Sequence, residues 1–413
     1  MKKTLTFAII SSSLVYMTSC DNSNASHTNT STTDSIIYPS VETNKANSEY
    51  KPAFEGQTRI NGVKTNTAFE FKVLTESLKS PWGIAVLPDG RLLITEKEGV
   101  LKIADEKGLL SESITGLPKV DADGQGGLLG ITLDPNFSTN RLVYWTFSEP
   151  ANGGNHTAVA KGTLSTDEKK IENAQVIYQS KPTYNGKLHY GGRIIFDKEG
   201  YLLVSIGERS DLETRPLAQD LKSSLGKIIR ITTDGKAAPN NPFSKDANAL
   251  PEIYTYGHRN PQSLAFHPET GDLWEAEFGP RGGDELNIIA SGKNYGWPVI
   301  TYGVEYSGKE IGQPPIQQKE GMEQPVYYWD PVISPSGMTF YTGNAIPEWK
   351  NNLFIGGLSS THIVRIVIKD NKVVGEERLL QKEGQRFRDV VQGKNEDLFA
   401  VTDAGRLYRI YKK

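Results

Sequence analysis

The feature that most constrains the fold is a unit that recurs along the chain. Each copy has a short apolar segment, a tight turn and a second short apolar segment. In the first copy, residues 82–86 lead through the turn 88–91 into residues 92–95. Gly, Pro, Asp and Asn at the turns are typical of paired β-strands. The six copies begin near Trp82, Leu129, Gly192, Ser263, Gly337 and Arg388, at intervals of roughly 45–75 residues.

Six such units favour an all-β fold, a six-bladed β-propeller, in which the first strand of each unit faces a central channel. No long amphipathic helical period interrupts them. We expect residues 67–74 to pair with residues 406–410, which would close the ring with a strand from each end of the domain. Hairpins alone are also compatible with a pair of β-sandwiches.

The N-terminus reads as a targeting segment. Lys2 and Lys3 precede an apolar stretch over residues 5–16, which is too short to span a bilayer comfortably. It ends at Cys20, the single cysteine of the chain, in a context that resembles the lipobox of bacterial lipoproteins. We therefore expect a lipoprotein signal peptide over residues 1–20 and a lipid on Cys20. An ordinary signal peptide or a chance cysteine remain alternatives.

Residues 21–67 are rich in Asn, Ser, Thr and Lys, which predicts a flexible polar tether. The propeller domain would then span residues 68–413. A signal peptide, a tether and a folded domain in this order predict an exported bacterial lipoprotein on the periplasmic or cell-envelope face, held at the membrane by its lipid alone.

Charge argues against a nucleic-acid partner. The formal net charge is −3, from 46 Lys and Arg against 49 Asp and Glu. A nucleic-acid surface needs a basic excess, and strong electrostatic steering needs an imbalance; this chain has neither.

Polar residues gather just before or at the start of the predicted inner strands, or at the ends of the strands that follow. The loop at residues 187–193 combines His189 with two glycines and Arg193. Glycines let the backbone approach a flat ligand, histidine accepts a proton near neutral pH, and arginine offers a fixed fork of donors. The other candidates are Gln125, Glu208, Arg259, Asn260, Gly279, Pro280, Arg386 and Arg388.

In a propeller these positions converge on one mouth of the channel. Such a set suits a planar polyanionic ligand with carbonyl groups. Singly, each residue has an ordinary interpretation: Glu208 as a salt-bridge partner, Arg386 and Arg388 as solvated strand residues, and Gly279-Pro280 as a plain turn.

The chain resembles the soluble aldose sugar dehydrogenases that depend on pyrroloquinoline quinone (PQQ), which are related to soluble quinoprotein glucose dehydrogenase. The resemblance covers most of residues 69–411. The motifs that carry it are GQGGLLG at 124–130, HYGGR at 189–193, YGHRNPQ at 256–262, DELN at 284–287, NYGWP at 294–298 and RFRDV at 386–390.

The resemblance implies the site roles. His189 matches the general base, and Glu208 matches the acidic residue that orients it. Arg259 matches a residue of the catalytic group that also contacts the cofactor. Gln125, Asn260, Arg386 and Arg388 match cofactor contacts. The carbonyls of Gly279 and Pro280 match calcium ligands, and Trp329 matches an aromatic at the sugar site, although a core tryptophan is the alternative. The implied partners are an aldose and an external electron acceptor, for a monomer or homodimer.

One position departs from the family pattern. Where the family places a lysine on a cofactor carboxylate, this chain has Ser359, in the sequence Gly357-Leu358-Ser359-Ser360. Either cofactor affinity is reduced or a neighbouring basic group substitutes. A calcium-dependent propeller lactonase or esterase and a non-catalytic binding propeller remain alternative functions.

Overall fold

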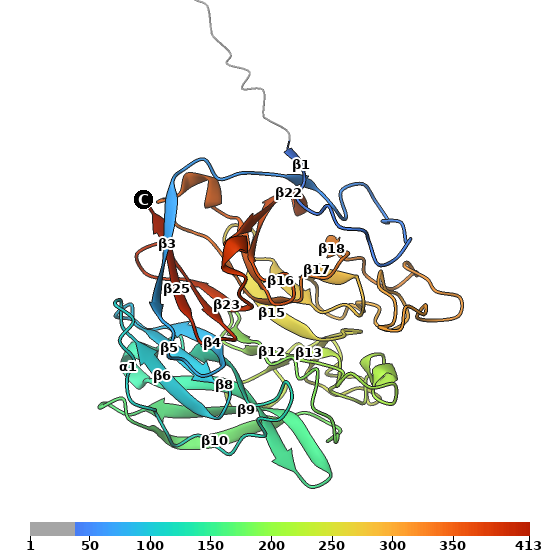
Figure 1. Ribbon diagram of the computed structural model, residues 1–413. Coiled ribbons are helices and arrows are strands. Elements are labelled where there is room, and N and C mark those ends of the chain that lie inside the picture. Colours follow the sequence, from blue (N-terminus) through green and yellow to red (C-terminus); the bar gives the residue numbers. More distant parts are fainter. Residues whose placement is uncertain (1–37) are drawn as a thin grey trace, which may run out of the picture. The chain divides into compact units, whose positions relative to one another are not determined.

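The computed structural model describes residues 38–413 (Figure 1). The predicted signal peptide, the lipidation site Cys20 and the first part of the predicted tether lie outside the described residues. No helix within residues 38–413 is long and apolar enough to cross a membrane.

Six sheets, antiparallel within each blade, form the six predicted blades, which confirms the propeller. The first three run from β4 to β14. Blade 1 has β4 (Pro81–Val86), β5 (Leu92–Glu96) and β6 (Val100–Ala104); blade 2 has β7 (Leu128–Leu133), β8 (Leu142–Ala151), β9 (Gly154–Leu164) and β10 (Ile171–Gln179); blade 3 has β11 (Ile194–Phe196), β12 (Leu202–Ile206), β13 (Lys227–Ile231) and β14 (Ile253–Tyr256).

The remaining blades complete the ring. Blade 4 has β15 (Pro261–Phe266), β16 (Leu273–Glu277), β17 (Asp284–Ile289) and β18 (Tyr327–Trp329); blade 5 has β19 (Pro335–Phe340), β20 (Leu353–Gly357), β21 (Ile363–Lys369) and β22 (Lys372–Leu379); blade 6 has β23 (Phe387–Gln392), β24 (Leu398–Thr402) and β25 (Leu407–Lys412). The helical elements are short: α1 (Phe137–Asn140) and the 3₁₀ turns Arg215–Ala218, Pro347–Trp349 and Gln381–Glu383.

The N-terminal strand β3 (Phe69–Thr75) completes blade 6 by pairing antiparallel with β25. This confirms the predicted closure of the ring. In each blade the first strand is innermost, and neighbouring inner strands contact one another around the ring, from β4 through β7, β11, β15 and β19 to β23 and back to β4. The starts of these six strands therefore lie around one end of the channel.

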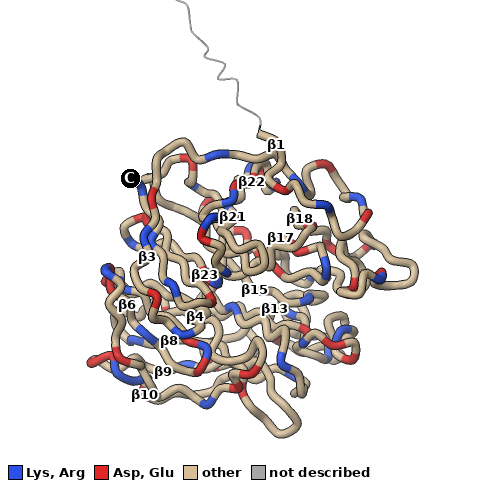
Figure 2. Tube along the Cα trace, in the orientation of Figure 1, with Lys and Arg blue, Asp and Glu red and all other residues tan. Residues whose placement is uncertain are grey.

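Apolar side chains fill the spaces between neighbouring blades. One cluster joins blades 1 and 2 around Trp145 and Phe147, and another joins blades 5 and 6 around Trp349 and Phe387. Strands that are apolar on both faces, such as β5 and β12, account for this packing because each blade is covered by two neighbours. Basic and acidic residues are interspersed over the whole described trace (Figure 2).

The predicted tether is wrong for residues 38–67. These residues, which we call the N-terminal strap, lie along blade 5, where β1 (Tyr38–Ser40) pairs with β2 (Asn61–Gly62) and Gly62 pairs with Glu376 of β22. The Gln57 side chain in the strap is fully buried. The polar composition suggested a solvated linker, but here the polar groups bind polar groups of blades 4 and 5.

Candidate active site

The starts of the inner strands surround a cavity of about 430 Å³. All six blades contribute to its wall, as the sequence predicted for the polar loops. Its lining includes Ser80, Trp82, Lys97, Gln125, His189, Gly191, Gln262, Phe278, Tyr306, Ser334, Leu358, Arg386, Arg388 and Asp403.

His189 holds an unusual backbone conformation at this wall. Its φ is +49°, in the left-handed region that few residues other than glycine adopt, although His tolerates it better than most. The backbone N–H of His189 donates to Oε1 of Gln125 at 2.9 Å, so the glycine-rich loop before β7 secures the histidine loop. A side chain at Gly191 would clash with the backbone of β12, since an added Cβ would lie 2.6 Å from the carbonyl oxygen of Ser205.

His189 and Glu208 form a buried pair. The Nδ1 atom of His189 lies 2.6 Å from Oε1 of Glu208, and the two side chains are 4% and 1% exposed. Because a carboxylate accepts, Nδ1 carries the hydrogen in this pair and Nε2 keeps its lone pair. Within residues 38–413, Nε2 has no hydrogen-bond partner. Burial and then the charge of Arg259 lower the pKa of His189 to about 4, so the ring is neutral at neutral pH.

Arg386 and Arg388 present guanidinium groups at the cavity. Their Nε atoms both donate to Asp403, at 2.8 Å each. Burial alone would raise the pKa of Asp403, but the charges and hydrogen bonds of the two arginines outweigh it and hold the pKa below its ordinary value. Arg386 is half exposed at the rim, whereas Arg388 is 15% exposed.

Asn260 and Arg259 lie behind the first layer of the wall. The Oδ1 atom of Asn260 accepts the backbone N–H of Gly191 at 3.0 Å, and Glu277 accepts both backbone N–H groups of residues 259 and 260. Arg259 lines a small adjoining cavity, separated from the main one by Phe278. Asn260 Nδ2 and Arg259 Nε are buried without a partner among the described residues.

Gly279 and Pro280, the predicted calcium ligands, line the same small cavity as Arg259. The carbonyl oxygen of Gly279 accepts Nη1 of Arg259 at 2.6 Å, and its N–H donates to Asp284. The carbonyl oxygen of Gly279 is therefore occupied by a guanidinium in this structure.

Blade 4 also has a second group of ligand atoms that the sequence did not reveal. Nitrogen and carboxylate oxygen atoms of His258, Glu275 and Glu277 lie within 4.8 Å of one another, and all three residues are buried. Burial and then the charge of Glu277 raise the pKa of Glu275 well above its ordinary value. In the sequence, the signal for this group was the pair Glu275 and Glu277, which are charged residues two positions apart in a buried strand, β16.

The structure corrects the position of Trp329, which lies in the core and not on the cavity. It ends β18, is 3% exposed, and its Nε1–H donates to Oε2 of Glu376 at 3.1 Å. It packs edge-on against Tyr327, in the cluster between blades 4 and 5. The core alternative is therefore correct.

Arg193 is also structural. Its Nη1 lies 3.0 Å from Oδ2 of Asp389, and its Nε donates to the carbonyl of Gln262. Its guanidinium lies 4.6 Å from the ring centre of Trp82. Since these partners belong to blades 6, 4 and 1, Arg193 joins four blades across the channel.

Several wall residues were not predicted, above all Trp82, Lys97 and Tyr306. Tyr306 is 69% exposed at the cavity, and its hydroxyl accepts Nη2 of Arg259 at 3.4 Å. Lys97 follows β5 and donates to the carbonyl of Gly124. Trp82 opens the first repeat and so had a positional signal, whereas Tyr306 comes from a long irregular connection between β17 and β18.

The chain matches known proteins over most of the propeller. The family model described as Glucose / Sorbosone dehydrogenase matches residues 78–409. The chain is 40% identical to the aldose sugar dehydrogenase YliI of Escherichia coli (strain K12) over 82% of this chain and 92% of that protein.

Solved structures agree with this match. The crystal structure of the soluble aldose sugar dehydrogenase of E. coli in the apo-form has a TM-score of 0.80 at 40% identity, over 84% of this chain and 100% of that one. The PQQ-bound form of the aldose sugar dehydrogenase of Streptomyces coelicolor has a TM-score of 0.68 at 29% identity, over 84% and 99%. The chain therefore belongs to the glucose/sorbosone dehydrogenase family.

Proposed function

We propose that this protein is a PQQ-dependent aldose sugar dehydrogenase that oxidises aldoses at the anomeric carbon to lactones. The observation that carries the proposal is the buried pair of His189 and Glu208, which leaves one neutral imidazole nitrogen free beside a cavity. The similarity to aldose sugar dehydrogenases, one of them PQQ-bound, supports the substrate class and the cofactor.

The wall of the cavity fits this cofactor, a planar tricyclic quinone with three carboxylates. Arg386 and Arg388 supply fork-shaped donors for carboxylates. Behind this wall, Asn260 Nδ2 and Arg259 Nε are buried donors without a protein acceptor within residues 38–413, and such donors suit a ligand that brings its own oxygens.

Calcium would be held by the carbonyl oxygens of Gly279 and Pro280. Oxygen ligands suit this hard cation, and it would supply positive charge in the small cavity that adjoins the proposed cofactor site. Because Nη1 of Arg259 now occupies the acceptor of Gly279, we expect calcium binding to move that guanidinium.

His189 acts as the base in this proposal. The bound quinone supplies the hydride acceptor. Nε2 of His189 would accept the proton of the anomeric hydroxyl, and loss of this proton together with a hydride from the anomeric carbon would convert the sugar to the lactone. Glu208 holds the ring in the reactive tautomer and stabilises the imidazolium that forms.

Tyr306 takes the place that the sequence gave to Trp329. Its exposed ring at the cavity offers an apolar face to a sugar ring, with its hydroxyl fixed by Arg259. We further propose that the protein is exported and anchored at the membrane through a lipid on Cys20.

Reconstitution tests the proposed function. Purified protein with PQQ and Ca²⁺ should reduce a dye in the presence of aldoses, and removal of calcium with a chelator should abolish the reaction reversibly. Protein without PQQ is the control. Lactone hydrolysis that depends on calcium, with no sugar oxidation, would instead support the hydrolase alternative. Absence of both activities in cofactor-loaded protein would favour a binding propeller.

A further inference from the structure

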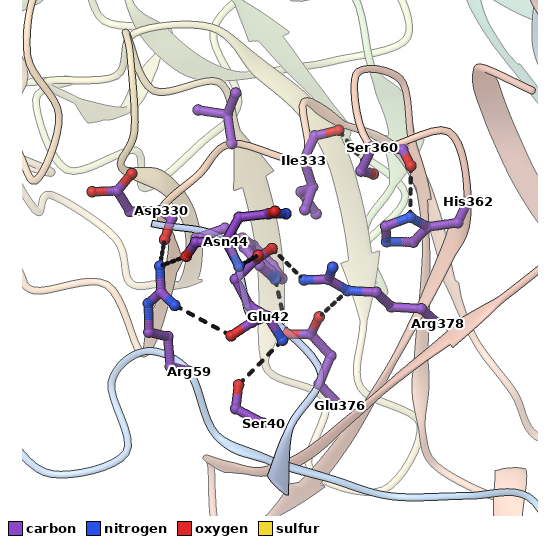
Figure 3. Close-up of polar contacts among 12 residues, drawn as sticks. Ser40, Glu42, Asn44, Arg59, Asp330, Ile333, Ser360, His362, Glu376 and Arg378 are labelled. Atoms are coloured by element: carbon purple, nitrogen blue, oxygen red, sulfur yellow. Dashed lines mark hydrogen bonds and ion pairs between the residues drawn. The ribbon is translucent and has the colours of Figure 1, made fainter. Parts of the chain in front are cut away.

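The N-terminal strap makes polar contacts that reach toward the cavity. It precedes residue 78, where the match to the family begins. It also bridges two blades: β2 joins β22 of blade 5, and the carbonyl of Gln57 accepts the N–H of Tyr328 in blade 4. Figure 3 shows Glu42, Asn44 and Arg59 of the strap next to Asp330, Glu376 and Arg378.

Asp330 is the centre of these contacts. It is 4% exposed, and its carboxylate accepts hydrogen bonds from two successive strap residues. Oδ1 accepts the backbone N–H and Nδ2 of Asn47, at 2.8 and 2.9 Å. Oδ2 accepts the backbone N–H of Ser48 at 3.1 Å and lies 3.1 Å from its hydroxyl, which is equally close to the carbonyl of Tyr302. The carbonyl of Asp330 accepts Nη2 of Arg59 at 2.7 Å (Figure 3).

A buried carboxylate needs these donors. Removing a hydrogen-bond partner of a buried charged group leaves its desolvation uncompensated, so the group moves toward water. Asp330 opens the turn of residues 330–334 between β18 and β19, and a movement of Asp330 would therefore move that turn.

The far end of the turn reaches the cavity. The N–H groups of Ile333 and Ser334 donate to Oδ2 of Asp284 at 2.8 and 2.7 Å, and Oδ1 of Asp284 accepts the N–H of Gly279. Ser334 lines the cavity and its hydroxyl bonds that of Ser359. A continuous set of contacts thus runs from the strap, through Asp330 and the turn, to the cavity wall and Gly279.

We propose that the strap is a positioning element of the cofactor cavity, in which Asn47 and Ser48 fix Asp330 and thereby the turn of residues 330–334. The proposal rests on the function proposed above only for the identity of the ligand. Neither Asn47 nor Ser48 touches the cavity, so their effect is on the affinity of the site and not on the chemical step.

The test compares two strap variants. Asn47→Ala/Ser48→Ala removes two side-chain donors to Asp330, and with them the contacts of Asn47 Oδ1 with Nε of Arg281 and of the Ser48 hydroxyl with the carbonyl of Tyr302. Thr65→Ala is the matched control, because Thr65 Oγ1 binds Glu377 and Trp349 of blade 5, away from the cavity. Both should lower the melting temperature.

The expected difference lies in two other measurements. Without cofactor, hydrogen exchange of the Ile333 and Ser334 amides should be about tenfold faster in the double variant and unchanged in the control. The Kd for PQQ with Ca²⁺ should rise about tenfold in the double variant only, which corresponds to about 1.4 kcal/mol, with kcat at saturation unchanged.

Equal exchange and equal PQQ affinity in the two variants would overturn the proposal. If the double variant does not fold, Ser48→Ala alone serves, with a smaller effect expected in the same direction. A wild-type protein that does not bind PQQ would refute the proposed function, whereas the exchange measurement would still decide the role of the strap.

Discussion

Replacing His189 by Asn removes the proposed base, Nε2, but keeps a side-chain donor to Glu208. The side-chain amide nitrogen of Asn can take the position of Nδ1 and donate to Glu208, whereas nothing replaces Nε2. Asn also tolerates the left-handed backbone at this position, where φ is +49°. We therefore expect the loop and the cofactor site to persist and the base alone to be lost.

The magnitude follows from the role of the base. General base catalysis contributes typically about 10²–10⁴ in rate, so kcat for dye-coupled aldose oxidation should fall by about that factor at saturating PQQ and Ca²⁺. The Kd for PQQ, measured by titration of the same variant, should stay within a few-fold of wild type. His156→Asn is the matched control, since His156 pairs with Glu149 at 2.8 Å outside the cavity lining.

The same variant tests the electrostatics of the pair. In the folded protein the pKa of His189 is lowered from its ordinary 6.5 to about 4. The unfolded chain therefore binds a proton at higher pH than the folded chain. The contribution of neutral His189 to the free energy of unfolding is therefore fully present above about pH 6.5 and is lost as the pH falls toward 4.

At about 1.4 kcal/mol per pH unit the total loss is about 3 kcal/mol, of which about 2 kcal/mol falls between pH 7 and pH 5. Denaturant unfolding of the apo-protein at these two pH values should show a smaller loss in His189→Asn than in wild type by about this amount. Near wild-type turnover of the loaded variant would refute His189 as the base. An equal pH dependence of stability would refute its buried, neutral state.

Three further outcomes are expected. Ser359→Lys, at the rim beside Ser334, should lower the Kd for PQQ by about tenfold or more, as a charge-assisted hydrogen bond does; no change in a variant that folds would indicate that another cation, such as Lys97, already serves. Tyr306→Ala should raise KM for aldoses with little change in PQQ affinity, and an unchanged KM would remove Tyr306 from the sugar site. Cys20→Ser should release the protein from membranes with its activity per folded molecule retained; retention of the variant after salt washing would count against the lipid anchor.

The sequence alone determined the propeller and the position of its site. Each repeat carries its own strands and turn, so local pattern is sufficient to predict the blades and the pairing of the first strand with the last. Because the inner strands all begin at one end of the channel, the position of His189, Gln125, Arg386 and Arg388 in the repeat also predicted that they would meet.

Tertiary structure decided what depends on distant partners. Trp329 is a core residue because Glu376, on another blade, accepts its N–H, and no local pattern reveals that acceptor. The strap has the composition of a linker, yet Asn47 and Ser48 satisfy a carboxylate more than 280 residues away. Composition predicts how a segment interacts with water, whereas order in a polar segment depends on whether the fold presents a buried group that needs its donors.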